Sequence, residues 1–99
     1  MSNPVSLVGK RILVTGASSG IGRSCAIVAS RLGATVVLAA RRKDALEETR
    51  SRMESPERHL CLACDVSDTI TLENLIQNAA NGGKLDGLVH AAGVGPLMP

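Results

Sequence analysis

Four short apolar runs, separated by amphipathic segments, constrain the fold of this chain more than any other feature. The runs cover residues 12–14, 35–40, 59–64 and 88–91, and each has the composition of a buried strand. Between them, apolar side chains recur at helical spacing. Because consecutive parallel strands need a right-handed crossover, this alternation predicts a parallel sheet with helices on both faces. We expect the strand order 3-2-1-4, one half of a doubly wound Rossmann-type fold plus the first strand beyond its switch point.

The three predicted helices each carry one apolar face. The first begins at Ile21 and stops at Gly33, the second covers residues 44–54 and ends at Pro56, and Ser67 or Asp68 caps the third. Glu48 and Arg52 lie at helical spacing on the solvated side of the second helix. The predicted apolar faces consist of Ile21, Cys25, Val28, Ala29 and Leu32; of Ala45, Leu46, Thr49 and Met53; and of Leu72, Leu75, Ile76 and Ala79.

A glycine-rich loop at residues 15–22 joins the first predicted strand to the first predicted helix. Gly16 allows a sharp turn, Gly20 lacks a side chain where a pyrophosphate would approach, and Gly22 allows close helix packing. Backbone N–H groups and the helix dipole at this point favour an anion. An ordinary tight turn is the alternative. The position of the loop inside a strand–helix–strand unit favours dinucleotide binding.

The spacing of this loop, Gly-x-x-x-Gly-x-Gly, resembles the cofactor motif of the short-chain dehydrogenases/reductases. Two further motifs match that family in order and position. Cys64-Asp65-Val66 resembles its Asp-Val after the third strand, and His90-Ala91-Ala92-Gly93 resembles its Asn-Asn-Ala-Gly after the fourth. The resemblance spans essentially the whole chain. It implies that residues 1–99 are the N-terminal part of an NAD(P)-binding Rossmann domain.

The resemblance implies roles for residues at three strand ends. Asp65 would bond the adenine amino group, or cap a helix, and Val66 would bond the ring through its backbone. The Ser18 and Ser19 hydroxyls would bond ribose or phosphate oxygens, or local backbone. Gly93 would let the ribose lie against the fourth strand. The predicted cofactor-binding residues are Gly16, Ser18, Ser19, Gly20, Ile21, Gly22, Arg41, Arg42, Asp65, Val66, Ala92 and Gly93.

The end of the second strand favours NADP over NAD. An acidic residue near this point usually binds the ribose diol of NAD, whereas a nearby arginine accommodates the 2′-phosphate of NADP. Here Ala40 is followed by Arg41 and Arg42, whose forked donors suit a phosphate. A solvated basic helix start is the alternative.

No catalytic residue is predicted. The family uses a Tyr with a Lys four residues later, but the chain has no tyrosine, and Lys10, Lys43 and Lys84 are not placed like that lysine. The resemblance implies the NADP(H)-binding portion of an oxidoreductase that transfers hydride between nicotinamide and a carbonyl or alcohol substrate. A 3-oxoacyl-carrier-protein reductase is one such enzyme. We expect the 99 residues alone to be inactive. A non-catalytic dinucleotide-binding module and an inactive truncated fragment are the alternatives.

Composition excludes several other classes. The net charge of +2 and the absence of aromatic residues argue against a nucleic-acid partner. The apolar runs are too short to span a membrane. Three cysteines without an export signal predict reduced thiols and a cytoplasmic location. Cys61 and Cys64 would be buried on opposite faces of a strand, and no metal site is expected. His90 is interpreted as a packed strand-end histidine. Full-length relatives imply a homo-oligomer.

Overall fold

Four parallel strands form one sheet in the order β3-β2-β1-β4, as the sequence predicts. The structure, a computed structural model, describes residues 6–65, 69–80 and 83–91. The strands are β1 (Arg11–Thr15), β2 (Thr35–Ala40), β3 (Leu60–Ala63) and β4 (Gly87–His90). Their order reverses between β2 and β4, so β1 lies at the switch point of the sheet.

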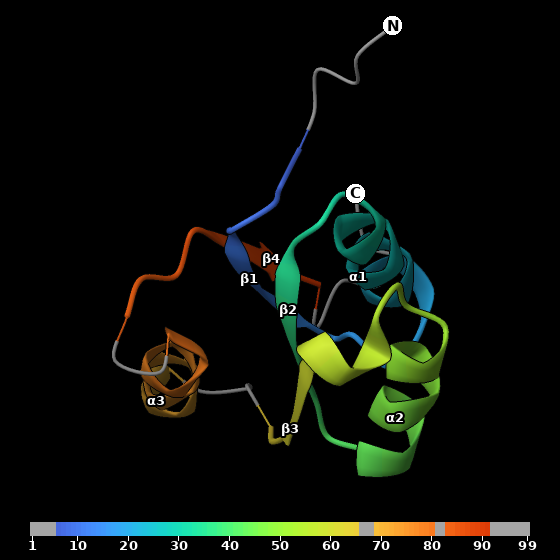
Figure 1. Ribbon diagram of the computed structural model, residues 1–99. Helices are drawn as coiled ribbons and strands as arrows, with labels where there is room; N and C mark the ends of the chain where they lie inside the picture. Colours follow the sequence, from blue (N-terminus) through green and yellow to red (C-terminus); the bar gives the residue numbers. More distant parts are fainter. Residues whose placement is uncertain (1–5, 66–68, 81–82, 92–99) are drawn as a thin grey trace, which may run out of the picture.

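Helices cover both faces of the sheet. Figure 1 shows α1 (Gly20–Arg31) and α2 (Lys43–Ser51) on one side and α3 (Thr69–Ala80) on the other. Side chains of β1 alternate between the two layers: Val14 packs with α1 and α2, and Leu13 packs with α3. In β2, Val36 and Leu38 likewise pack in the layer with α1 and α2, whereas Val37 and Ala39 pack in the layer with α3. Burial on both faces explains why these strands are continuously apolar.

The two cysteines at β3 follow the predicted alternation. Cys61 belongs to the core under α2, and the half-buried Cys64 packs in the cluster under α3. Burial raises the pKa of both thiols above its ordinary value. All three cysteines of the chain are free thiols, and these two are held as protonated core side chains.

The apolar face predicted for α1 is wrong in part. The helix buries Gly22, Ala26, Ala29 and Ser30 against the sheet, whereas Ile21 is 64% exposed and Val28 is 52% exposed. Small side chains bring the helix axis close to the strands. Larger apolar residues fall on the flank of the helix, where the described residues do not cover them.

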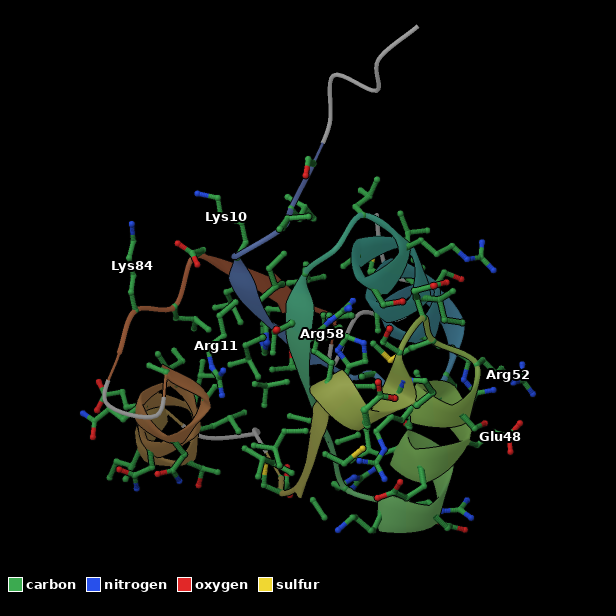
Figure 2. All side chains as sticks on the ribbon, viewed as in Figure 1. Lys10, Arg11, Glu48, Arg52, Arg58 and Lys84 are labelled. Carbon is green, nitrogen blue, oxygen red and sulfur yellow. The ribbon has the colours of Figure 1, made fainter. Side chains whose placement is uncertain are left out.

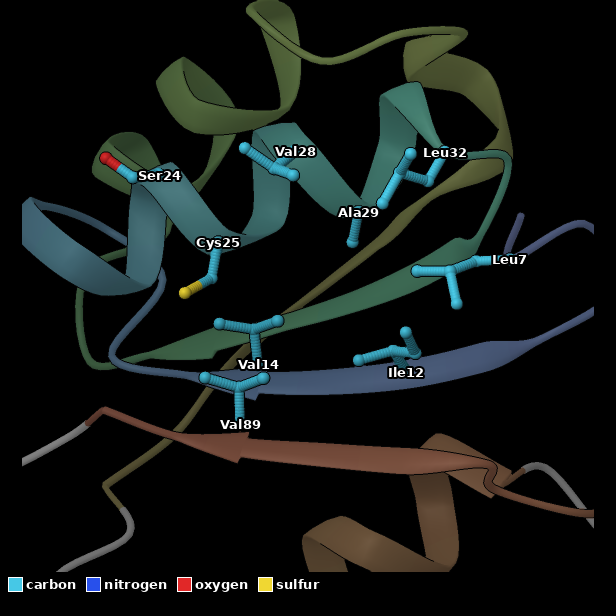
Figure 3. A pocket seen from close by; sticks show the side chains of 9 residues that line it. All are labelled: Leu7, Ile12, Val14, Ser24, Cys25, Val28, Ala29, Leu32 and Val89. Atoms are coloured by element: carbon cyan, nitrogen blue, oxygen red, sulfur yellow. The ribbon is translucent and has the colours of Figure 1, made fainter. Parts of the chain in front are cut away.

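That flank forms one wall of an apolar groove over β1 and β4, with a volume of about 370 Å³ (Figure 3). Cys25, Val28 and Leu32 line it from the helix, and Val14 and Val89 line it from the strands. Four of the five residues of the predicted apolar face, Cys25, Val28, Ala29 and Leu32, therefore border this open groove, and of these Ala29 is also buried in the closed core.

The second helix ends at Ser51, three residues before the predicted end. The chain then turns inward, so that Met53 is buried and the Glu54 N–H donates to Ser30 Oγ at 3.0 Å. Pro56 does not end α2 but begins a short 3-10 helix, η1 (Pro56–Arg58). The predicted outer pair is confirmed, since Arg52 Nη2 lies 2.9 Å from Glu48 Oε2; Figure 2 labels both side chains.

Asp86 joins the amino ends of β1 and β4. Its carboxylate accepts the Arg11 N–H at 2.8 Å, and Lys84 Nζ lies 3.6 Å away; Figure 2 labels Arg11 and Lys84. The backbone hydrogen bond from Arg11 is the main cause of the lowered pKa of Asp86. The Arg11 side chain also donates to the Ala79 carbonyl, which ties the end of α3 to the sheet.

A buried histidine, His59, joins the amino end of β2 to the segment after α2. Its Nδ1 accepts the Val36 N–H at 3.0 Å, and its Nε2 donates to the Glu54 carbonyl at 2.8 Å. The ring must be neutral to accept at Nδ1. Burial is the main cause of its lowered pKa, and the nearby Arg58 and Arg50 act in the same direction.

We predict that the protein loses stability as the pH falls below about 6.5, the unfolded-state pKa of histidine. The folded state holds the His59 pKa below that value, so the unfolded state binds more protons in this range. The free energy of unfolding from urea titrations on either side of this pH measures the effect. His59→Gln flattens the profile, and the surface variant Arg52→Gln does not. Parallel profiles for wild type and His59→Gln would contradict the assignment.

Candidate functional site

The carboxyl ends of the four strands meet at one edge of the sheet. Thr15, at the end of β1, lies beside Ala39 of β2 and His90 of β4, and Ala40 lies beside Ala63. The glycine loop, the arginine pair and Asp65 follow three of these strand ends. In open α/β sheets ligands bind at this edge, next to the switch point.

The glycine loop requires glycine at each of its three positions. Gly16 and Gly20 have φ angles of +68° and +57°, which L side chains rarely adopt. A Cβ on Gly22 would collide with the Gly16 carbonyl and lie 3.2 Å from the Ala17 Cα. Gly22 therefore allows α1 to start directly against the loop. A Cβ on Gly20 would have no described atom within 4 Å, so this side of the loop is open.

Several donors in the loop fit an anion such as a pyrophosphate. Among the described residues, the Ser18 N–H donates to no backbone carbonyl, and neither serine hydroxyl has a hydrogen-bond partner. The first turn of α1, which includes Ile21, contains no acidic residue, and Ser19 provides no side-chain cap. Within this first turn, no carboxylate therefore compensates the positive end of the helix dipole.

The end of β2 presents exposed cations. Ala40, Arg41 and Arg42 follow in order, and both arginines are exposed. Arg42 Nη2 lies 3.0 Å from Asp44 Oδ2, and this hydrogen bond is the main cause of the lowered pKa of Asp44. Arg41 forms no ion pair with any residue in the described ranges.

Asp65 lies next to the arginine pair. The Cys64 N–H donates to the Ala40 carbonyl at 2.8 Å. Asp65 and Arg41 are the residues that directly follow these two hydrogen-bonded neighbours. Asp65 is exposed. Val66, the predicted partner of the adenine ring, and the predicted caps Ser67 and Asp68 lie outside the described residues.

At the end of β4, His90 contacts Thr15, the first residue of the glycine loop. Its Nδ1 lies 2.7 Å from Thr15 Oγ1, and the Ala91 N–H donates to the Thr15 carbonyl at 3.2 Å. The ring is exposed, so the expectation of a packed histidine is wrong; a polar contact with Thr15 orients it instead. Ala92 and Gly93 lie outside the described residues.

Two residues near the loop are not identified by the sequence patterns. Arg23 of α1 donates to the Ser18 carbonyl at 2.6 Å and to Thr49 Oγ1 at 2.8 Å, and Thr49 donates to the Ala17 carbonyl at 2.7 Å. The sequence predicts Thr49 only as part of an apolar face. A hydroxyl among apolar positions of a helix is the one sequence signal that could have indicated a buried polar contact.

Other site types have no support in the described part of the chain. No group of three His, Cys, Asp or Glu side chains there could hold a metal ion. None of the helices within residues 6–65, 69–80 and 83–91 has the length and apolar character needed to cross a membrane.

Comparisons with known proteins agree with this geometry. A family model described as short chain dehydrogenase matches residues 10–99. A fatty acyl-CoA reductase of Mycobacterium tuberculosis is 40% identical over 92 residues, which cover 91% of this chain and 31% of that protein. This chain therefore spans about a third of the length of such curated relatives.

Two solved structures share the fold. The structure of a hydroxysteroid dehydrogenase from Escherichia coli has a TM-score of 0.77 and 31% identity, covering 87% of this chain and 37% of that one. A short-chain dehydrogenase/reductase of unknown function from Caenorhabditis elegans, solved with cofactor, has a TM-score of 0.74 and 31% identity. The match covers 83% of this chain and 32% of the Caenorhabditis elegans chain.

We predict that Gly22→Ala lowers the free energy of unfolding by about 3 kcal/mol, because the new methyl group meets backbone that cannot move aside without shifting the loop. Gly83→Ala is the matched control, since its Cβ would lie at an ordinary 3.4 Å from the Ala80 carbonyl oxygen. Chemical denaturation measures both variants. Equal stability of the two variants would show that the contact between α1 and the loop is not tight.

Proposed function

The chain belongs to the short-chain dehydrogenase family, and we propose that it binds NADP(H) for hydride transfer between the nicotinamide and a carbonyl or alcohol substrate. Members of this family are oxidoreductases that use nicotinamide cofactors, NAD or NADP. The preference for NADP, the residue assignments and the activity of the whole protein are parts of the proposal.

The glycine loop is the proposed pyrophosphate site. The Ser18 N–H, which donates to no backbone carbonyl among the described residues, and the start of α1 supply donors and a positive dipole end. The open side of Gly20 provides room for a phosphate to approach the backbone, and the exposed Ile21 borders that opening. Gly16 and Gly22 hold the loop in this shape.

The observation that carries the choice of NADP is the end of β2, where two exposed guanidinium groups follow Ala40 and no carboxylate occupies the strand tip. A 2′-phosphate would find forked donors there. Arg41 has no protein carboxylate partner among the described residues, so we assign it the main contact. Arg42 already pairs with Asp44, but both side chains are more than 70% exposed, and such a pair is weak and exchangeable.

The remaining assignments follow the other strand ends. Asp65 would accept from the adenine amino group, with Val66 bonding the ring through its backbone. Ala92 and Gly93 would lie beside the ribose after β4. The support for Asp65 is its position next to Arg41, on the side of the sheet edge away from β4. The roles of Val66, Ala92 and Gly93 rest on the family motifs alone.

When bound, the nicotinamide supplies or accepts the hydride, and this chain binds and orients the cofactor. Reduction of a carbonyl also needs a general acid for the developing alkoxide. The 99 residues contain no tyrosine, the acid implied by the family resemblance. Reduction of a 3-oxoacyl thioester is one reaction compatible with the proposal, and a homo-oligomer is the expected state of the full enzyme.

Titration calorimetry with NADPH and with NADH tests the proposed cofactor. We predict saturable binding with a preference for NADPH, and a loss of about 10–100-fold in NADPH affinity for Arg41→Ala, the range for one charge-assisted hydrogen bond. NADH affinity should hardly change. Arg52→Ala removes an exposed arginine from the far end of α2 and is the matched control. A preference for NADH would overturn the assignment of the arginines.

We also predict that the 99 residues alone do not oxidise NADPH in the presence of a simple ketone, because they contain no tyrosine to protonate the alkoxide. The loss of NADPH absorbance measures turnover, and calorimetry measures binding, so the two assays are independent. Measurable turnover would show that a residue other than a tyrosine acts as the proton donor.

A further inference from the structure

We propose that Arg23 and Thr49 form a clasp that positions the glycine loop for the cofactor. The clasp consists of the Arg23 guanidinium on α1, the Thr49 hydroxyl on α2 and the two loop carbonyls that they hold. The inference rests on the proposed function and deepens it: both side chains are positioning residues that act through the loop backbone and do not themselves touch the cofactor.

The contacts form a closed chain between the loop and α2. Arg23 Nη2 donates to the Ser18 carbonyl at 2.6 Å, and its Nε donates to Thr49 Oγ1 at 2.8 Å. Thr49 Oγ1 lies 2.7 Å from the Ala17 carbonyl and 3.3 Å from the Ala45 carbonyl. Since a hydroxyl has one proton, the shorter contact identifies Ala17 as its main acceptor.

These contacts fix the direction of two peptide groups. In a planar trans peptide, the carbonyl and the following N–H point in opposite directions. With the Ala17 carbonyl held by Thr49 of α2, the Ser18 N–H is directed away from Thr49. With the Ser18 carbonyl held by Arg23 of α1, the Ser19 N–H is directed away from Arg23. The Ser18 N–H donates to no backbone carbonyl among the described residues. The clasp thus presents donors that a pyrophosphate would use.

The charge of the clasp also suits an anion. Within the part of the chain that the structure describes, Arg23 forms no ion pair, and its partners are neutral oxygens of Ser18, Ala45 and Thr49. Its positive charge therefore stays uncompensated beside the start of α1. A cation at this end of a helix opposes the dipole, so the position gains most when an anion is bound.

The arrangement predicts a signature that separates the clasp from the arginines after β2. The pyrophosphate is common to both coenzymes, whereas the 2′-phosphate is present only in NADPH. A variant of Arg23 or Thr49 should therefore lower the affinities for NADPH and for NADH by the same factor. Arg41→Ala should lower the affinity for NADPH alone.

Thr49→Val and Thr49→Ser form the matched pair that tests the clasp. Valine keeps the shape of the fully buried side chain but removes the hydroxyl, and serine keeps the hydroxyl. By calorimetry on the folded protein, we expect Thr49→Val to lower the affinities for NADPH and for NADH each by about tenfold, which corresponds to the loss of one hydrogen bond. Thr49→Ser should restore both affinities to within about twofold of wild type.

A second variant protects the test if Thr49→Val does not fold. Arg23→Gln removes the guanidinium from a half-buried site and leaves the contact between Thr49 and Ala17 in place, and Arg52→Gln is its surface control. We expect Arg23→Gln to lower the affinities for NADPH and for NADH by the same factor. Folded variants that bind both coenzymes like wild type, or that lose only NADPH affinity, would overturn the clasp. If wild-type protein bound neither coenzyme, the proposed function would fail together with this inference.

Discussion

Parallel pairing of β1 between β2 and β4 is the constraint on which the rest of the structure depends. It places the carboxyl ends of the strands at one edge, and so brings residues that are far apart in the chain next to the glycine loop. It also leaves β1 buried on both faces, which requires helices on both sides of the sheet and therefore the crossovers that carry α1, α2 and α3. The topology brings these segments together, and contacts such as those of Arg23 and Thr49 then hold the loop backbone.

The sequence predicts the fold well because the determining signals are local. Apolar runs, helical spacing and glycine positions each depend on a few neighbouring residues, and the strand order follows from crossover handedness. Predictions that depend on packing partners are less accurate. Nothing in the spacing of Ile21 and Val28 shows that small residues such as Ala26 would face the sheet instead, and the early end of α2 depends on where Met53 and Ser30 meet.

The candidate site shows the same division. Gly16, Gly20 and Gly22 are identifiable because their backbone conformation or contacts exclude side chains. Arg23 and Thr49 are not, because a hydrogen bond between residues distant in sequence leaves no periodic pattern. The site is built from backbone donors and guanidinium groups, with Asp44 and Asp65 at its margin. This balance suits a cofactor with several phosphates better than a cationic ligand.

Hydrogen–deuterium exchange with and without NADPH tests the central claim most directly, because it reports where on the chain the cofactor binds. The account predicts slower exchange in peptides that contain Ser18 to Gly22 and in those that contain Arg41 and Arg42, with little change at the start of β1 and at Lys84, on the opposite edge of the sheet. Protection of the opposite edge, or protection spread evenly over the chain, would contradict the placement of the cofactor at the carboxyl ends of the strands.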